Sequence, residues 1–333
     1  MQANPHTNLT PRIRPHVCLL AFFLALGPAQ LSAQPYPTKP VRLIVPFPPG
    51  GSTDFVGRAV AHSLAGSLGH QVVVDNRGGA GAVIGTMLAA KAAPDGYTLL
   101  LGSSSGMVTN PLLHAKLPYD PFRDFDPVIR LNRNAQALVA TLSLPANNVK
   151  ELIALAKAKP GQLNIASPGR GSSNHVGAEM LKHLAAIDIV HVPYKGAAPA
   201  LVDLLAGNVQ LQLTSLPTVM SHIKAGRLKI LGVGSPQRSA LLPDVPTIAE
   251  SGVPGYDDTV WFGLFAPRGT SSRIIDLLNQ HVAKALASRE LSQRLLTQGA
   301  EPFPSTPREL SDYMKSEHAR WTRIIEVAGI RLD

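Results

Sequence analysis

Two short loops of glycine and hydroxyl-bearing residues are the stretches of this 333-residue chain best suited to binding chemistry. The first, VPFPPGGSTD at residues 45–54, follows directly on the apolar run VRLI. Its prolines direct the chain out of the strand without unpaired amide donors, and its glycines let a ligand approach the backbone closely. The Ser-Thr-Asp cluster consists of residue types that cap helix N-termini. Because a helix N-terminus offers free amides and a positive dipole, this loop predicts a site for a carboxylate.

The second loop, ASPGRGSSNH at residues 166–175, repeats the order of strand, proline, glycines, serines and helix. One such loop in each half of the chain, at the carboxyl ends of strands, would place two helix N-termini across one cleft. Either loop alone could be a plain connection between a strand and a helix. Between them the loops contain one cation, Arg170, and Lys195 follows a later strand. We therefore predict that backbone amides, rather than these two charges, bind the anion.

A third stretch, GSSSG at residues 102–106, satisfies the G-x-S-x-G pattern of a hydrolase nucleophile at Ser104. That nucleophile requires a helix immediately afterwards, whereas the following MVTNP contains Pro111 and has no helical period. No His-Gly-Gly oxyanion motif precedes it. A periplasmic serine hydrolase using Ser104 is thus the alternative to a binding protein, and we expect Ser104 to be a cleft-lining hydroxyl instead.

The glycine-rich GGAGAVIG at residues 78–85 lies between a strand and a helix, as a dinucleotide fingerprint would. Its spacing is G-x-G-x-x-x-G and no acidic residue ends the next strand, so we expect no nucleotide cofactor. Two roles remain open for this stretch: tight packing of the helix on the sheet, and a contribution to the cleft. The histidines show no H-x-x-x-H or H-x-x-E spacing, and the only cysteine is Cys18 near the N-terminus, so no metal site is predicted.

The composition is that of a globular protein with a sizeable core, since 45% of the residues are hydrophobic and 16% are charged. Two of the 31 basic residues lie in the first 33 residues, which leaves 29 against 22 acidic residues and a net charge of +7. These charges are scattered singly, and only 5% of the residues are aromatic. We therefore expect no binding to nucleic acid.

Residues 1–33 have the features of a secretory signal peptide. Arg12 and Arg14 precede the apolar stretch of residues 17–26, and small residues follow it. We place cleavage after Ala33, with cleavage after Ala29 as the alternative. The apolar stretch is shorter than the ~20 residues that span a membrane, which argues against a membrane anchor. An exported chain without cysteine in its mature part indicates a location in the bacterial periplasm.

Short apolar runs alternate with stretches of helical period along the mature chain. The runs that predict strands lie at residues 41–45, 71–75, 97–101, 163–167, 188–192, 209–213 and 228–233. Helices are predicted at residues 55–68, 82–92, 149–159, 271–287, 291–298 and 307–328, with another after the second loop. This alternation favours an α/β fold with largely parallel sheets.

About 300 mature residues exceed one comfortable α/β unit, so two domains are expected. We predict a first lobe of residues 36–134 plus 261–333 and a second lobe of residues 135–260, inserted between the two parts of the first. The two connecting segments, near Asn134 and near Val260, would then form a hinge.

The motifs, taken in order, resemble a known family. VPFPPGGSTD, DNRGGAGAVIG, ASPGRGSSNH, VPYKG, LPDVPTIAESGVPGY and WFGLFAP are similar to the successive signatures of the Bug family. Its members are periplasmic solute receptors of tripartite tricarboxylate transport systems. The resemblance covers essentially the whole mature chain, and six motifs in series are specific. Many relatives carry an aromatic-Asp pair where this chain has Leu213-Thr214, which leaves the exact ligand open.

This resemblance implies a type II periplasmic binding protein fold, in which two α/β lobes joined by a hinge close a central cleft on a small carboxylate-bearing solute. The protein would be a monomeric receptor, not an enzyme, and would bind a small organic acid or amino acid for sensing or for the membrane components of a tripartite tricarboxylate transporter. The motifs assign ligand binding to Phe47, Gly50, Gly51, Ser52, Thr53, Asp54, Gly81, Ala82, Ser104, Ser167, Gly169, Gly171, Ser172, Ser173, His175, Lys195 and Thr214.

Overall fold

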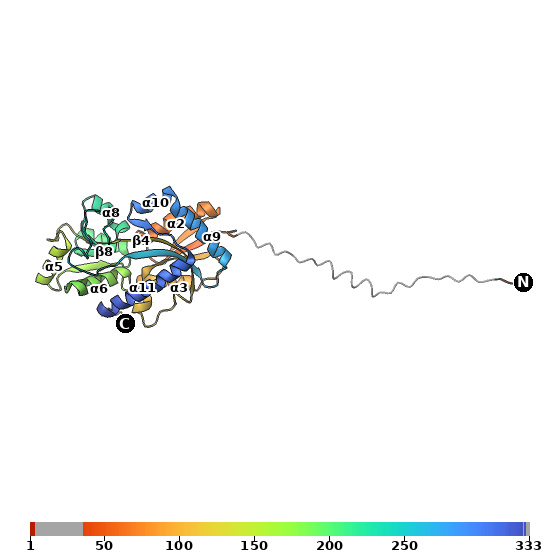
Figure 1. Cartoon of the computed structure of the whole chain (residues 1–333), viewed down its shortest axis with the longest axis horizontal. Helices are drawn as coiled ribbons and strands as arrows, with labels where there is room; N and C mark the ends of the chain where they lie inside the picture. Colours follow the sequence, from red (N-terminus) through yellow and green to blue (C-terminus); the bar gives the residue numbers. More distant parts are fainter. Residues whose placement is uncertain (4–35, 329, 331–333) are drawn as a thin grey trace. The chain divides into compact units, whose positions relative to one another are not determined.

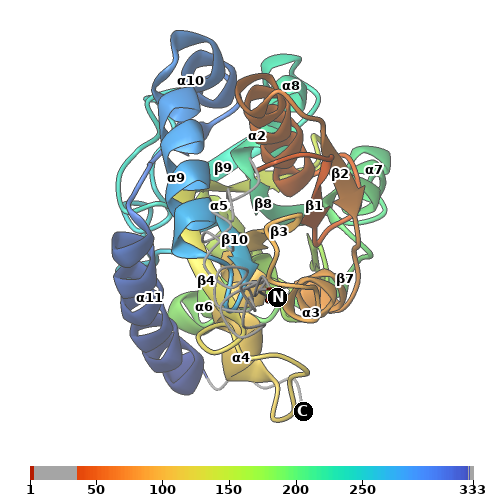
Figure 2. The same ribbon diagram turned by 90° about the vertical axis from the view of Figure 1, so that its right-hand side faces the viewer.

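The computed structural model describes residues 1–3, 36–328 and 330, so the predicted signal peptide lies outside the described residues apart from its first three. Every described helix and strand belongs to the unit that begins at Pro37 (Figure 1). Among the described residues, no helix combines the length and the apolar character needed to cross a membrane. The unit contains two β-sheets, and helices cover both of them (Figure 2).

The first sheet has six strands in the order β11-β4-β10-β3-β1-β2. Their bounds are β1 Val41–Val45, β2 Val72–Asn76, β3 Thr98–Ser103, β4 Phe125–Asn134, β10 Val260–Pro267 and β11 Ala300–Pro302. The helices associated with it are α2 Ser52–Leu68, α3 Val83–Ala90, α4 Asn110–Leu113, α9 Ser272–Ala287, α10 Arg289–Leu296 and α11 Pro307–Ala328. Two short turns complete this part: a 3₁₀ turn at Ala80–Ala82 and a π-helical turn at Ser105–Thr109.

The second sheet has five strands in the order β7-β6-β8-β5-β9. Their bounds are β5 Gln136–Ala140, β6 Asn164–Ser167, β7 Val190–Pro193, β8 Leu211–Ser215 and β9 Lys229–Val233. Four helices accompany these strands: α5 Val149–Ala158, α6 Ser173–Ala185, α7 Ala197–Ala206 and α8 Leu216–Lys224. Helix α11, from the end of the chain, also packs against α6.

Both sheets are mixed, so the prediction of largely parallel sheets was wrong. β1 pairs in parallel with β2 and β3, and β6 with β7 and β8. In contrast, β10 is antiparallel to β3 and β4, β11 to β4, and β5 to β8 and β9. The reason is the path of the chain: β4 leaves the first sheet, β10 returns to it, and the two lie side by side, so they run in opposite directions. The chain crosses at Ala135 and again over residues 234–259.

Each sheet has its own hydrophobic core. Around the first sheet, the indoles of Trp261 and Trp321 and the ring of Phe265 are fully buried. Around the second, Leu138, Leu211 and their neighbours pack beneath α5 and α6. Each fully buried large side chain contributes about 1.5–3 kcal/mol relative to an exposed one. The two cores meet where Val176 of α6 packs into the first and Ile324 of α11 contacts both.

Helix α2 begins differently from the prediction that its Ser-Thr-Asp cluster would cap it. Gly51 is the N-cap residue, and no side chain accepts a capping hydrogen bond from the amides of the first turn. Ser52, Thr53 and Asp54 are the first three residues of the helix itself. The helix ends at the predicted residue, because Gly69 adopts the left-handed conformation with a φ of 68°.

Candidate ligand-binding cleft

A small cavity of about 30 Å³ lies between the two sheets. From the first-sheet side it is lined by Phe47, Pro48, Gly51, Ser52, Thr53, Ser103, Ser104, Ser105, Val260 and Phe262; from the second-sheet side by Pro168, Ser173, Asn174, Ala197, Thr214, Ser215 and Thr218. No charged residue and no histidine is among these lining residues. Any anion bound here would be held by hydroxyl groups, amides and helix dipoles.

Helix N-termini surround the cavity. Gly51 to Thr53 form the start of α2, and Ser173 and Asn174 open α6. Ala197 is the first residue of α7, and Ser215 is the N-cap residue of α8. These helices have 17, 13, 10 and 9 residues, so each carries a full dipole with its positive end at the cavity. Four such ends around one uncharged space favour negative charge there.

The first loop is held in shape from behind by Asp54. Its carboxylate accepts hydrogen bonds from the Gly50 amide at 3.1 Å and from Asn76 Nδ2 at 3.0 Å, and it pairs with Arg58 at 3.0 Å. The same Asn76 amide donates to the Phe47 carbonyl at 3.0 Å. Burial raises the pKa of Asp54, but the bonds from Arg58, Gly50 and Asn76 together hold it below its ordinary value. Asp54 therefore stays ionised and positions the loop without lining the cavity.

The second loop and the π-helical turn meet directly across the cleft. The hydroxyls of Ser105 and Ser173 lie 3.1 Å apart, and the Ser173 amide donates to Ser105 Oγ at 3.0 Å. Thr109 Oγ1 donates to the Gly171 carbonyl at 3.0 Å. Gly81, with a φ of 60°, lies so close to the loop that a Cβ there would be 2.4 Å from the Arg170 carbonyl oxygen. The two sides of the cleft are thus in contact at this end.

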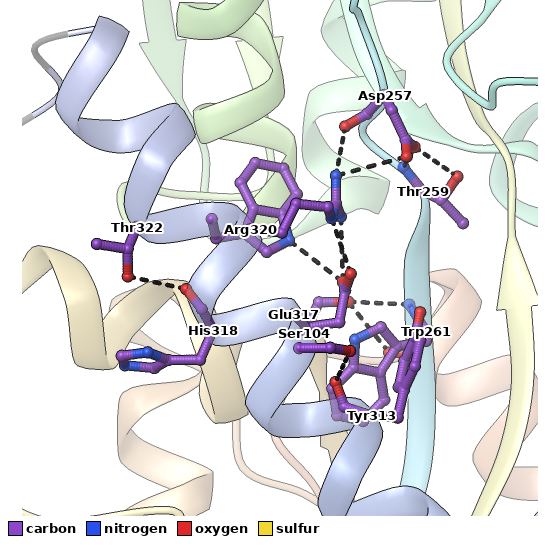
Figure 3. Close-up of polar contacts among 11 residues, drawn as sticks. Ser104, Asp257, Thr259, Trp261, Tyr313, Glu317, His318, Arg320 and Thr322 are labelled. Atoms are coloured by element: carbon purple, nitrogen blue, oxygen red, sulfur yellow. Dashed lines mark hydrogen bonds and ion pairs between the residues drawn. The ribbon is translucent and has the colours of Figure 1, made fainter.

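Ser104 bonds to the backbone and has none of the surroundings of a nucleophile. Its Oγ accepts from the Trp261 amide at 2.9 Å and donates to the Trp261 carbonyl at 3.3 Å (Figure 3). The expectation that no helix follows it was wrong, because the π-helical turn and α4 come directly after, with Pro111 in the first turn of α4. Proline is tolerated there, where its missing amide has no helical partner. The hydroxyl ties β3 to the returning strand β10, so the serine hydrolase alternative is unsupported.

The segment that returns from the second sheet is anchored by α11. Arg320 donates to the Asp257 carbonyl at 2.9 Å and pairs with Glu317 at 2.8 Å (Figure 3). Glu317 also accepts from the Trp321 indole at 3.3 Å. This network joins the C-terminal helix to the point where the chain re-enters the first sheet.

His175, Glu179 and His191 form the one group of potential metal ligands among the described residues. The two imidazole rings are stacked, with centroids 4.1 Å apart and planes 27° from parallel. An ion bound by both rings would have to lie in both ring planes, which this stacking does not allow. Glu179 is already paired with Lys182 at 2.9 Å. As arranged, these donors are not directed at one ion.

The structure places seven of the seventeen predicted site residues on the cavity wall: Phe47, Gly51, Ser52, Thr53, Ser104, Ser173 and Thr214. The other ten do not line it: Gly50, Asp54, Gly81, Ala82, Ser167, Gly169, Gly171, Ser172, His175 and Lys195. Of these, Ser172 caps α6 by accepting from the His175 amide at 3.2 Å, while Lys195 is exposed.

Sequence reasoning missed ten lining residues: Pro48, Ser103, Ser105, Pro168, Asn174, Ala197, Ser215, Thr218, Val260 and Phe262. Most of them are immediate neighbours of predicted residues within the same motifs. Ser215 ends β8 and is the N-cap residue of α8, whose first turn contains Thr218, and a search for further helix N-termini after strands would have found both residues. Val260 and Phe262 carry no polar signal, and only the antiparallel return of β10 places them here.

A family model described as "Tripartite tricarboxylate transporter family receptor" matches residues 56–330 of this chain. Protein BugT of Bordetella pertussis is 40% identical over 319 residues, which cover 95% of this chain and 98% of BugT. The solved structure of R. palustris Rpa4515 with adipate has a TM-score of 0.87 and 39% identity, and covers 89% of this chain and 99% of that one. The periplasmic binding protein BugD has a TM-score of 0.85 and 35% identity, with 89% and 99% coverage.

Proposed function

This chain belongs to the tripartite tricarboxylate transporter receptor family, and on that premise we propose that its cleft binds a small organic acid through a carboxylate held by helix N-termini. It is a solute-binding receptor with the type II periplasmic binding protein fold, not an enzyme. The structure of Rpa4515 with adipate supports a carboxylate as the ligand of this cleft.

One observation carries this proposal: the cavity lining has no positively charged side chain, but the positive ends of four helix dipoles point into it. The lining residues include no cation, yet α2, α6, α7 and α8 all begin at the cavity. Such a site attracts negative charge without an ion pair. The amides of a helix's first turn have no carbonyl partner within the helix, so they can donate hydrogen bonds to a bound anion. We assign the carboxylate to the amides of Gly51 to Thr53 and of Asn174, since the Ser173 amide already donates to Ser105 Oγ.

Ligand capture would involve closure of two lobes, residues 36–134 plus 261–333 and residues 135–260. The crossings near Asn134 and Val260 would act as the hinge between them. The predicted ligand-binding residues that do not line the cavity have supporting roles in this proposal: Asp54 shapes the first loop, and Gly81 lets the lobes approach.

We assign the protein to the periplasm after removal of residues 1–33, in keeping with the periplasmic location that BugD has by description. There it would act as a monomer and pass its ligand to the membrane components of a tripartite transporter.

Thermal melting with a panel of small carboxylic acids tests this function. A ligand at a hundredfold excess over Kd stabilises the folded state by about 2.7 kcal/mol, which raises the melting temperature measurably. The methyl esters of the same acids are the matched controls, because they lose the charge and otherwise differ by one methyl group. We expect acids to shift the melting temperature and their esters not to. Equal shifts by acid and ester, or no shift with any acid, would contradict the proposal.

A further inference from the structure

The carboxyl group of Asp258 is buried in the second crossing, two residues before the cavity-lining Val260. Asp258 and Tyr256 have exposed fractions of 0% and 2%. Two glycines enclose the carboxyl group: a Cβ added to Gly177 of α6 would lie 2.7 Å from Oδ2, and one added to Gly234 would overlap Oδ1. An aspartate is almost never buried so completely unless it is paired, so its surroundings decide its protonation state.

The surroundings of Asp258 offer no free positive charge among the described residues. The titratable and charged groups that act on its carboxyl group are Tyr256, Asp257 and Arg320, of which only Arg320 is a cation. Arg320 pairs with Glu317 at 2.8 Å and with the Asp257 carboxylate at 3.5 Å, and it donates to the Asp257 carbonyl at 2.9 Å (Figure 3). An ionised Asp258 would therefore lose its hydration without gaining an ion pair.

The hydrogen bonds around Tyr256 require a proton on Asp258. Tyr256 Oη lies 3.2 Å from the Gly177 carbonyl oxygen and 2.9 Å from Asp258 Oδ2. A hydroxyl group has one proton and can donate it to only one of these two oxygens. A proton on Oδ2 completes the chain, because Asp258 then donates to Tyr256 and Tyr256 donates to Gly177.

The environment favours the protonated form of both groups. Burial, the largest cause, raises the pKa of Asp258 from 3.8 to about 8, and it raises the pKa of Tyr256 well above its ordinary value. Asp258 Oδ1 has no hydrogen-bond partner among the described residues. An unpartnered carbonyl oxygen costs less when the acid is neutral than when it is charged.

This chain of hydrogen bonds joins two parts of the cleft wall. Gly177 lies in the second turn of α6, whose first two residues, Ser173 and Asn174, line the cavity. Asp258 lies just before β10, which begins at the cavity-lining Val260. Because β10 belongs to the first sheet and α6 accompanies the second, the chain ties the two sides together next to the cleft.

We propose that Asp258 is a positioning residue that acts in its protonated form. The chain from Asp258 through Tyr256 to Gly177, which we call the acid link, holds the start of α6 against the start of β10. This inference rests on the proposed function, in which the Asn174 amide at the start of α6 binds the ligand carboxylate. Loss of the proton to solvent removes a donor and leaves a charge between two glycines, so the link opens. Ligand affinity therefore falls as Asp258 ionises.

Urea denaturation between pH 6.5 and pH 9.5 tests the protonation without a ligand. Between pH 3.8 and about 8 the folded chain binds more protons at Asp258 than the unfolded chain, so stability falls as the pH rises to about 8 and this loss then ends. Relative to Asp258→Asn, the folding equilibrium constant of the wild type should fall roughly tenfold from pH 6.5 to pH 8. Asp276→Asn, at an exposed position of α9, is the matched control and should keep the wild-type profile. Identical profiles for wild type and Asp258→Asn would overturn the inference.

Calorimetry at pH 7 and pH 9.5 tests the effect on the cleft, with the acid of the panel that shifts the melting temperature most. Its Kd for the wild type should rise about threefold to tenfold at the higher pH, the ratio that one net hydrogen bond is worth. Asp258→Asn should remove this pH dependence, because an asparagine amide donates to Tyr256 at either pH. Tyr256→Phe breaks the link at its centre, and at pH 7 it should bind as weakly as the wild type does at pH 9.5.

The outcomes separate this inference from the proposed function. The same pH dependence of Kd in the wild type and in Asp258→Asn would overturn the role of the acid link and leave the proposed function intact. Should Asp258→Asn not fold, full affinity of Tyr256→Phe at pH 7 would overturn that role. Failure of every acid to bind at either pH would overturn both.

Discussion

At the scale of single residues, the carboxylate of Asp54 bonds to its own loop and not to the cleft. Its partners are the Gly50 amide, Arg58 and Asn76, and it does not line the cavity. We expect Asp54→Asn to lower the free energy of unfolding by about 1 kcal/mol and to change ligand affinity by less than about tenfold. Urea denaturation and calorimetry measure the two quantities. A much larger loss of affinity would place the carboxylate against the ligand instead.

The stacked pair of His175 and His191 predicts a pH dependence of stability. Burial, the largest cause, lowers the pKa of His175 from 6.5 to about 4 and that of His191 from 6.5 to about 3. Between pH 6.5 and about 4 the unfolded chain therefore binds more protons than the folded one, so stability falls as the pH falls through this window. Above pH 6.5 this contribution is fully present.

The measurement is the free energy of unfolding at pH 7 and pH 5 for the wild type and for a His175→Gln/His191→Gln double variant. We expect the wild type to lose more stability between the two pH values than the variant does. The same loss in both proteins would mean that the pair is not the source of the pH dependence.

At the scale of elements, the approach of the two loops depends on Gly81. It has a φ of 60°, and a Cβ there would meet the Arg170 carbonyl oxygen at 2.4 Å. Gly69 has a φ of 68° and no neighbour within 4 Å, so Gly69→Ala introduces similar backbone strain without the clash. Gly69→Ala should lose about 1 kcal/mol of stability from backbone strain alone, and Gly81→Ala should lose more because of the clash. Only Gly81→Ala should also weaken ligand binding, by at least about tenfold. Equal affinities in calorimetry would argue against loop contact in the bound state.

Much of the element order could be predicted from the sequence, and the limits have physical causes. Helices such as α2 and α11 have long apolar periods with clear ends, and their predicted bounds are within three residues of those in the structure. β4 was missed, because FDPVIRLNRN contains a proline and several polar residues that only the burial between β10 and β11 explains. β5 and β10, both fully buried, were missed as well. Because these two strands make most of the antiparallel pairs, the prediction did not show that the sheets are mixed.

Only part of the candidate site was predicted, because sequence patterns show local loops but not the pairing of distant strands. Loops with glycine and serine after a strand can be recognised locally, and both predicted loops reach the cavity. The buried carboxamides of Asn132 and Asn134 could not be recognised, because only the pairing of their strand with Phe262 and Val260 places them on the cleft side. The polar face of a strand in sequence looks like a solvent-exposed face. Only the register between distant strands shows that it is buried.

At the scale of the whole molecule, the parts that carry the two sheets touch through Ser105 and Ser173, through Thr109 and Gly171, and through the packing of α11 on α6. In the proposed hinge motion, bending at Ala135 and residues 234–259 would separate the two polar contacts. Small-angle scattering should therefore give a smaller radius of gyration with a bound acid than without ligand. An unchanged radius with a ligand proven to bind would mean that the cleft does not close on it.

Capture of a carboxylate by amides and helix dipoles, rather than by a cation, is the claim on which the site assignment depends. The measurement that tests it most directly is calorimetry of the best-binding acid with Gly51→Pro and with Arg170→Ala, after circular dichroism confirms that both fold. Gly51→Pro removes one amide donor at the cavity wall, whereas Arg170 is an exposed cation of the second loop that does not line the cavity. We expect Gly51→Pro to weaken binding by at least about tenfold, and Arg170→Ala by less than about threefold with little dependence on salt. A silent Gly51→Pro together with loss of binding in Arg170→Ala would contradict the assignment.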